Sequence, residues 1–363
     1  MVRRERPTTH NNEQTVFLYS LMAFFSFLYG IAIRFRLRAY REGFFKERSL
    51  PGFVVSIGNI TCGGTGKTPA TLMLAKWASD EGYRVAILSR GHGGKYRSKV
   101  HEVSDGKNIK SDSLLSGDEP LLLARELKGI PVILSKKRYL AGMYAHRKHG
   151  TNFFILDDGF QHLELKRDLD LVLIDAGNPF GNCRVLPAGP LREPVDQLQR
   201  ADAFVITRAG DGDAAKRTGK ILEERFPSIP TFSADHQPVK LIFPHQNEDR
   251  SPFFLKDKRI LAFAGIAYPE AFRETLSKLG AAPVYFKSFR DHYRFKREEI
   301  EDLILKAEKA GADYILTTEK DWMRIAPFAI VCPKMAYLCI EFQFLAGDKG
   351  LFRMIKDGMI KKR

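Results

Sequence analysis

The sequence contains only four cysteines among its 363 residues, and it contains no internal repeat or low-complexity tract. The cysteines lie far apart, in none of the spacings typical of zinc ligands, at Cys62, Cys183, Cys332 and Cys339. This pattern excludes a disulfide framework and suits a reducing compartment. A nucleic-acid-binding motif is also missing, as is the interleaving of aromatic and basic residues found on nucleic-acid-binding surfaces, so we expect no nucleic-acid partner.

Acidic residues are few relative to basic ones. The 58 lysines and arginines stand against 43 aspartates and glutamates, which gives a formal net charge of +15 at pH 7. An excess of this size favours an anionic partner, such as a nucleic acid, an anionic membrane surface or a phosphorylated substrate. The hydrophobic fraction of 44% is ordinary for a globular chain, and the length suits two compact domains of roughly 150 residues each.

One uncharged apolar run, residues 16–33, lies near the N-terminus and approaches the ~17 to 20 residues needed to cross a bilayer. No small-residue cleavage site follows it, so it is not expected to be a signal peptide. The arginines after it predict that the rest of the chain stays in the cytoplasm. Arg3, Arg4 and Arg6 precede the run, so spanning the membrane, lying at its surface and packing on the globular part are all open.

A phosphate-binding loop is predicted between a short strand at 53–57 and a helix that starts at 67. The loop reads GNITCGGTGKTP over 58–69, and the strict pattern would have glycine at the position of Thr61. Its backbone N–H groups can surround phosphates, Lys67 can reach the β- and γ-phosphates, and the Thr68 hydroxyl can ligate Mg²⁺. The predicted nucleotide-binding residues are Thr61, Gly63, Gly64, Thr65, Gly66, Lys67 and Thr68. The segment Thr318-Glu-Lys-Asp321 does not fit the guanine-reading motif of GTPases, so ATP is the expected nucleotide.

Carboxylates follow other predicted strands. The apolar strand at 153–156 ends in Asp157 and Asp158, which is where P-loop proteins place the carboxylate that holds magnesium. Asp118, in the string GDEP, opens a helical run, where capping the helix and acting in catalysis are both open. Arg90 follows another strand in the string SRGHGG, and either a phosphate or solvent can be its partner.

Strands and helical runs alternate along the chain, which predicts an α/β fold with a P-loop NTPase-like parallel sheet and a second, smaller α/β domain. The expected strands lie near 53–57, 84–88, 131–134, 153–156, 170–174 and 203–207. The predicted parts are an N-terminal membrane-associated helix at 1–42, a kinase core at 43–234, a linker at 235–257 and a C-terminal α/β domain at 258–363. A two-stranded form of the linker, between Pro238 and Pro252, stays open.

Taken in order, the strings GNITCGGTGKTP, SRG, GDEP, LDDGFQH, LPAGPLRE, FAGI, DHY and TTEKDWMR resemble the tetraacyldisaccharide 4′-kinase family of lipid A biosynthesis. The resemblance runs from the N-terminal helix to about Arg324. It implies an enzyme on the cytoplasmic face of the bacterial inner membrane. Such an enzyme uses ATP and Mg²⁺ to phosphorylate the 4′-hydroxyl of a tetraacylated glucosamine disaccharide 1-phosphate.

The resemblance also implies roles for individual residues. Lys67 and Thr68 would bind nucleotide and metal, and Asp157 and Asp158 would hold or organise magnesium. Asp118 would be the catalytic base, with His292 from the second domain as its partner. Weaker candidates for substrate contact are Arg90, His162 and Glu193. The chain departs from the family pattern at His92 and at Ala267-Tyr268, which puts local substrate contacts in doubt.

Two other functions stay open at this stage. One is a kinase of the same mechanism that acts on another membrane-bound or phosphorylated metabolite. The other is a membrane-tethered nucleotide switch, which would need no base for an acceptor hydroxyl and would act by binding a partner protein. The sequence shows no sign of an obligate protein partner.

Overall fold

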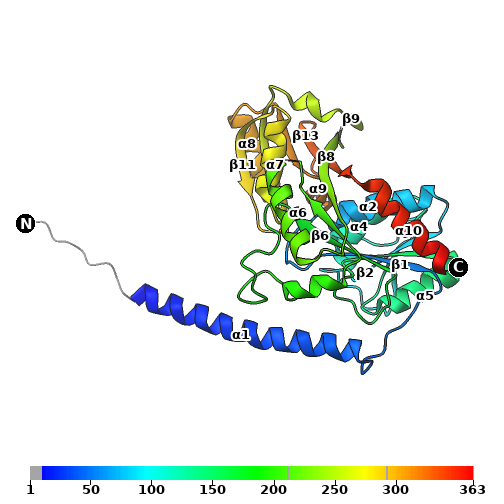
Figure 1. The fold of residues 1–363 in the computed structure, drawn as a ribbon. Helices are drawn as coiled ribbons and strands as arrows, with labels where there is room; N and C mark the ends of the chain where they lie inside the picture. Colours follow the sequence, from blue (N-terminus) through cyan, green and yellow to red (C-terminus); the bar gives the residue numbers. More distant parts are fainter. Residues whose placement is uncertain (1–9, 211, 292, 363) are drawn as a thin grey trace, which may run out of the picture.

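The computed structural model describes residues 10–210, 212–291 and 293–362, and its strands form one mixed sheet of 13 strands (Figure 1). The strand order is β11-β10-β12-β13-β8-β7-β6-β1-β5-β2-β4-β3, with β9 paired to β8. The strands from β7 to β4 are parallel, and antiparallel pairing of β13 with β8 joins the C-terminal strands to them. The predicted α/β class with a mostly parallel sheet is thus confirmed, whereas the domain boundaries stay predictions.

The centre of the sheet is β1 (Phe53–Gly58), between β5 (Phe153–Asp157) and β6 (Leu169–Asp175). All residues of these strands are buried, as expected for near-continuous apolar runs covered by helices on both faces. Ile57 of β1 lies opposite Asp157 of β5, so the phosphate loop and the paired aspartates leave the sheet at the same edge. This edge is where ligands bind in parallel α/β sheets.

Shorter strands and surrounding helices complete the first half of the chain, and His101–Ser104 forms its antiparallel edge. The strands are β2 (Val85–Ser89), β3 (His101–Ser104), β4 (Val132–Leu134) and β7 (Ala203–Thr207). The helices are α2 (Lys67–Asp80), α3 (Ser113–Ser116), α4 (Asp118–Glu126), α5 (Arg138–His149), η1 (Val195–Arg200) and α6 (Asp213–Arg225).

The second half continues the same sheet. Its strands are β8 (Thr231–Phe243), β9 (Glu248–Arg250), β10 (Arg259–Ala264), β11 (Ala282–Ser288), β12 (Tyr314–Thr318) and β13 (Met335–Ala346). Its helices are η2 (Pro252–Leu255), α7 (Pro269–Lys278), α8 (Arg297–Lys309), α9 (Glu319–Ile325), η3 (Ala326–Phe328) and α10 (Asp348–Lys362). Most of β8, together with β9 and η2, falls inside the predicted linker at 235–257, and β8 pairs with strands of both halves.

The C-terminal helix α10 packs back on the first half of the chain. Leu351 and Ile355 belong to the same buried cluster as Phe53 of β1 and Leu74 of α2. The ring of Phe352 stacks on that of Trp77 with 4.5 Å between centroids, and Figure 1 shows α10 beside α2. The two halves therefore both contribute to this buried cluster, in addition to their shared sheet.

Helix α1 (His10–Arg41) runs alongside the remainder of the chain and projects beyond it towards its N-terminal end (Figure 1). The segment Leu18–Arg41 is long and apolar enough to cross a membrane, by length and composition. Three side chains attach it to the core: Ser26 Oγ donates to the Val185 carbonyl, Tyr29 OH to the Arg192 carbonyl, and Arg36 to the Gln161 carbonyl. Nine of its large apolar side chains are exposed: Leu18, Tyr19, Leu21, Phe24, Phe25, Phe27, Leu28, Ile31 and Phe35.

Candidate active site

The phosphate loop joins β1 to α2 and owes its shape to glycine. Gly63 and Gly66 have φ of 120° and 84°, and Gly66 is the N-cap of α2. A Cβ at Gly66 would collide with the imidazole of His236, so only glycine fits there. Thr65 is buried, and its hydroxyl has no hydrogen-bond partner among the described residues. A phosphate oxygen would satisfy such a group, so the loop suits the ligand predicted from the sequence.

Lys67 is held above this loop by two oxygen atoms. Its ammonium donates to Asn59 Oδ1 at 3.1 Å and lies 3.7 Å from Asp158 Oδ1. Asn59 is fully buried and also donates to the carbonyl of Thr61, which ties the lysine to the backbone of the loop. The sequence analysis assigned no role to Asn59, although it belongs to the string that revealed the loop.

The two adjacent aspartates face different surroundings. Asp157 is buried at the end of β5 and accepts a hydrogen bond from Ser89 Oγ at 3.1 Å. Burial, followed by the charges of Glu119 and Asp158, raises the pKa of Asp157 to about 7. Asp158 has a φ of 55°, in the left-handed region, and its carboxylate pairs with Arg192 at 2.8 Å. Burial opposes its ionisation, but Lys67 and Arg192 outweigh burial and lower the pKa of Asp158.

The predicted magnesium ligands are Thr68, Asp157 and Asp158. No group of three or more histidine, cysteine, aspartate or glutamate side chains among the described residues is placed to hold a metal ion. Magnesium bound with a nucleotide needs no such cage, because waters and phosphates complete its shell beside one or two carboxylates. A divalent cation would stabilise the charged form of a buried carboxylate with acidic neighbours, such as that of Asp157. The residues present therefore fit Mg²⁺.

Asp118 is the first residue of α4, and its side chain points across to α9 rather than capping its own helix. Its Oδ2 accepts a hydrogen bond from Arg324 Nε at 2.7 Å. The next residue, Glu119, pairs with Lys320 at 2.9 Å, so α4 and α9 are linked by two ion pairs. Among the described residues, no side chain caps the start of α4 with a hydrogen bond.

The other predicted site residues are distributed differently. His292 lies outside the described residues. Arg90 is exposed at the end of β2, and its carbonyl accepts a hydrogen bond from Tyr96. Burial and neighbouring arginines lower the pKa of His162 to about 3, which keeps this imidazole neutral. Glu193 is fully buried and forms an ion pair with Arg200, so its contact is with the protein itself.

Arg138 is a charged residue of this region that the sequence analysis missed. It is buried at the start of α5, and burial lowers the pKa of its guanidinium. The negative charges of Asp158 and Asp157 act in the opposite direction and raise the pKa of Arg138. The positive charge of Arg138 in turn lowers the pKa of His162. Its sequence context is a plain helix start, which carries no signal of such a position.

Besides His236, the second half of the chain places near the phosphate loop the two residues that depart from the family pattern. A Cβ built on Gly63 would lie 3.4 Å from the Tyr268 hydroxyl, and one on Gly64 would lie 3.4 Å from the Ala267 methyl group. The guanidinium of Arg208 lies over the Tyr268 ring, 4.2 Å from its centroid. Tyr268 therefore covers one side of the loop.

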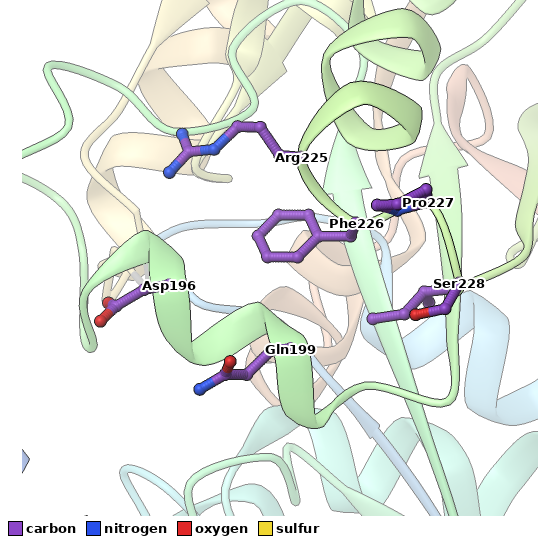
Figure 2. A pocket seen from close by; sticks show the side chains of 7 residues that line it. Asp196, Gln199, Arg225, Phe226, Pro227 and Ser228 are labelled. Carbon is purple, nitrogen blue, oxygen red and sulfur yellow. The ribbon is translucent and has the colours of Figure 1, made fainter.

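Two surface hollows lie elsewhere. One is lined by residues of η1 and of the end of α6, including Asp196, Gln199, Arg225 and Phe226, and contains none of the predicted site residues (Figure 2). The second lies between α1 and the loop before η1, and its lining includes Phe27, Gly30, Arg34, Val185 and Pro194.

Comparison with known proteins decides which family this architecture represents. The family described as Tetraacyldisaccharide-1-P 4′-kinase matches residues 18–359. The chain belongs to the tetraacyldisaccharide 4′-kinase family. It is 40% identical over 349 residues to the Tetraacyldisaccharide 4′-kinase of Syntrophus aciditrophicus, with 93% of each chain covered. It is 41% identical over 322 residues to that of Desulfotalea psychrophila, with 87% of this chain and 90% of the relative covered.

A solved structure agrees with this assignment. A crystal structure of LpxK from Aquifex aeolicus in complex with ATP has a TM-score of 0.76 and 34% sequence identity to this chain. The match covers 94% of this chain and 99% of the Aquifex aeolicus chain. The family resemblance predicted from the motifs is thus confirmed, and ATP is the nucleotide bound to that relative.

For this member of the tetraacyldisaccharide 4′-kinase family, two further residues of the site were missed. Arg192 pairs with Asp158, and Arg324 pairs with Asp118. Both occur in strings that carried the resemblance, LPAGPLRE and TTEKDWMR, but the strings alone do not show which acid each arginine meets. Their partners lie 34 and 206 positions away along the chain.

Proposed function

We propose that this chain is an ATP-dependent lipid kinase that phosphorylates the 4′-hydroxyl of a tetraacylated glucosamine disaccharide 1-phosphate. The observation that carries the proposal is the grouping of Lys67, Asp157 and Asp158 at one edge of the sheet, in a chain of this family. Phosphoryl transfer needs positioning and charge neutralisation more than covalent participation, and this group supplies both.

The phosphate loop and Lys67 bind the phosphates of ATP. The loop amides lie at the N-terminus of α2, where the helix dipole favours anions. Asn59 and Asp158 hold the ammonium of Lys67 beside the loop, which reduces the entropy lost when it meets the β- and γ-phosphates.

Thr68, Asp157 and Asp158 would hold Mg²⁺, which neutralises phosphate charge when it is bound. Arg192 and Lys67 keep Asp158 charged, while Ser89 orients Asp157. Asp158 serves in addition as the fixed counter-charge of Lys67.

Asp118 accepts the proton of the sugar hydroxyl, and His292 is its partner from the second half of the chain. The hydroxyl oxygen forms a bond to the γ-phosphorus as the bond to the bridging oxygen of ADP breaks. The proton then passes to the carboxylate, as general-base catalysis requires. The ion pair of Asp118 with Arg324 supports this role, because it directs the carboxylate away from its own helix and towards the second half.

The acceptor lipid reaches this site from the cytoplasmic face of the bacterial inner membrane. The exposed apolar side chains of α1 favour insertion into a bilayer. Four arginines near the C-terminal end of α1 each add about 1 kcal/mol to the free energy of binding to an anionic membrane surface. They are Arg34, Arg36, Arg38 and Arg41. The lining of the hollow beside α1 includes Val185 and Pro194, which lie on either side of Arg192 in the sequence.

Arg90, His162 and Glu193 have weaker assigned roles in lining the acceptor site. Arg90 is the exposed cation of the three and suits the 1-phosphate of the substrate. His162 is neutral and suits a hydroxyl group. Glu193 acts by fixing the loop through Arg200, next to Arg192.

The test is transfer of labelled γ-phosphate from ATP-Mg²⁺ to purified tetraacyl disaccharide 1-phosphate in detergent micelles. A labelled bisphosphorylated lipid that disappears with Lys67→Ala supports the proposal. Tight ATP binding without labelled lipid would instead favour another acceptor. Nucleotide hydrolysis that depends on an added protein would favour a nucleotide switch.

A further inference from the structure

Arg324 joins the two halves of the chain at the proposed base. We propose that Arg324 is a positioning residue, which orients the carboxylate of Asp118 for proton removal and makes that orientation depend on the docking of the second half. This inference rests on the function proposed above. It concerns how the base is held, which the motif comparison leaves open.

The guanidinium is first anchored within its own half. Its Nη1 donates to the Gly265 carbonyl at 3.0 Å and to Asp321 Oδ1 at 2.9 Å. Asp321 is fully buried and accepts two further hydrogen bonds, from Gly265 N at 2.9 Å and from Thr318 Oγ1 at 2.7 Å. These buried partners orient the guanidinium of Arg324 independently of its contact with Asp118.

From this anchor, Nε reaches across to Asp118 Oδ2 at 2.7 Å. The Arg324 side chain is 6% exposed and that of Asp118 is 19% exposed, so the contact is shielded while part of the carboxylate stays accessible. A charge-assisted hydrogen bond to one carboxylate oxygen fixes the torsion of the side chain. It thereby sets the direction in which the second oxygen, Oδ1, points.

Apolar packing holds the two helices at this distance. Leu122 of α4 belongs to the same buried cluster as Trp322 and Met323 of α9. Lys320 pairs with Glu119 beside the central contact. The base on α4 is thus aligned by a helix of the other half, and loss of docking would release the Asp118 carboxylate.

The experiment measures kcat, the KM for ATP, the KM for lipid and the thermal midpoint of Arg324→Gln and Arg324→Lys. We expect Arg324→Gln to lower kcat on the order of 100-fold, since a misplaced catalytic group costs about that much. The KM for ATP should change less than about twofold, because the hydrogen bonds of Arg324 among the described residues go to Asp118, Gly265 and Asp321 and not to the phosphate loop. Arg324→Lys should recover part of kcat, because lysine restores the charge but lacks the planar fork that binds Asp118, Gly265 and Asp321 together.

A double variant separates positioning from general destabilisation. Arg324→Gln added to Asp118→Asn should lower the residual rate less than about threefold, because the group that Arg324 orients is already lost. An equal fall in both backgrounds, or wild-type kcat in Arg324→Gln, overturns the proposal. If Arg324→Gln does not fold, Asp321→Asn replaces it. That variant loosens the anchor and should lower kcat without raising the KM for ATP, and unchanged kcat would again overturn the proposal.

Lys356→Met is the matched control. It removes another ion pair between the two halves, from Lys356 to Glu81 at 2.8 Å, at a position outside the proposed site. Its kcat should equal that of the wild type. If the wild type itself forms no labelled lipid, the proposed function fails. If the wild type and Lys356→Met are fully active and Asp118→Asn keeps only a small residual rate, the results for Arg324 decide this inference alone.

Discussion

Arg192 Nη1 donates to both carboxylate oxygens of Asp158 at 2.8 Å, and the Arg192 carbonyl accepts a hydrogen bond from Tyr29 of α1 at 2.9 Å. One residue therefore contacts both the apolar helix α1 and an aspartate of the proposed metal site. Since Asp158 also pairs with Lys67, the position of α1 is linked to the phosphate loop through three consecutive contacts.

Replacing Arg192 should change the pH dependence of the enzyme. Arg192 and Lys67 together lower the pKa of Asp158, so Arg192→Met removes one of the two cations and should raise that pKa. The acidic limb of the kcat/KM profile for ATP-Mg²⁺ should then move to higher pH, and activity at low pH should fall most. Arg217→Met, which removes an exposed arginine on α6, should leave the profile in place.

Membrane attachment should depend on the exposed face of α1. Phe24 and Phe27 are 56% and 66% exposed there, so Phe24→Asp with Phe27→Asp should strongly reduce sedimentation with vesicles that contain anionic lipid. Activity on vesicle-embedded lipid should fall, whereas the Kd for ATP should not change. Phe253→Asp, at an equally exposed phenylalanine of η2, is the control and should bind vesicles normally. An equal loss of ATP binding would mean that α1 is needed for the fold.

Tyr268 should contribute to nucleotide affinity. Its hydroxyl lies beside Gly63 and its ring stacks on Arg208, so Tyr268→Asn removes cover from the phosphate loop and a cation–π contact. Such a contact is worth about 0.5–2 kcal/mol, so the KM for ATP should rise between roughly twofold and thirtyfold with little change in kcat. Tyr268→Phe keeps the ring and should lie close to the wild type. Similar KM values for all three proteins would contradict this role.

His236 should make the fold sensitive to acid. Burial, with the nearby charge of Arg208, lowers the pKa of this imidazole to about 4, against about 6.5 in the unfolded chain. Between these pH values the unfolded chain binds more protons than the folded protein. The contribution of neutral His236 to the free energy of unfolding is therefore complete above about pH 6.5 and is lost as the pH falls towards 4. Thermal midpoints at pH 7.5 and 5 should differ less for His236→Gln than for the wild type. Comparing the two proteins isolates His236 from the other buried groups that titrate.

Much of the site could be predicted from the sequence because its parts are local. The strand–loop–helix at 53–80 and the strand that ends in Asp157 and Asp158 are each encoded by consecutive residues, through apolar runs, glycines and a terminal charge. The parallel pairing that brings them to one edge follows from the alternation of strands and helices. Their place in the structure therefore agrees with the prediction.

Other features could not be predicted because they depend on the pairing of distant segments. The segment 235–257 was predicted as a linker with a two-stranded form left open, and β8 runs through it and pairs with β13 and β7. The run Val-Lys-Leu-Ile-Phe at 239–243 allowed a strand, but no local pattern shows which distant strands it pairs with. His236, which lies against Gly66, belongs to this segment, and its contact exists only because β8 enters the sheet beside β7.

The sequence by itself determined the fold class, the phosphate loop with Lys67, the paired aspartates and the apolar N-terminal helix, because each depends on neighbouring residues and on backbone preferences. Only the tertiary structure decided which charges meet: Arg192 with Asp158, and Arg324 with Asp118. The physical reason is that an ion pair requires two side chains within about 4 Å. For residues 206 positions apart, that distance is set by how the sheet and helices pack, which no local pattern encodes.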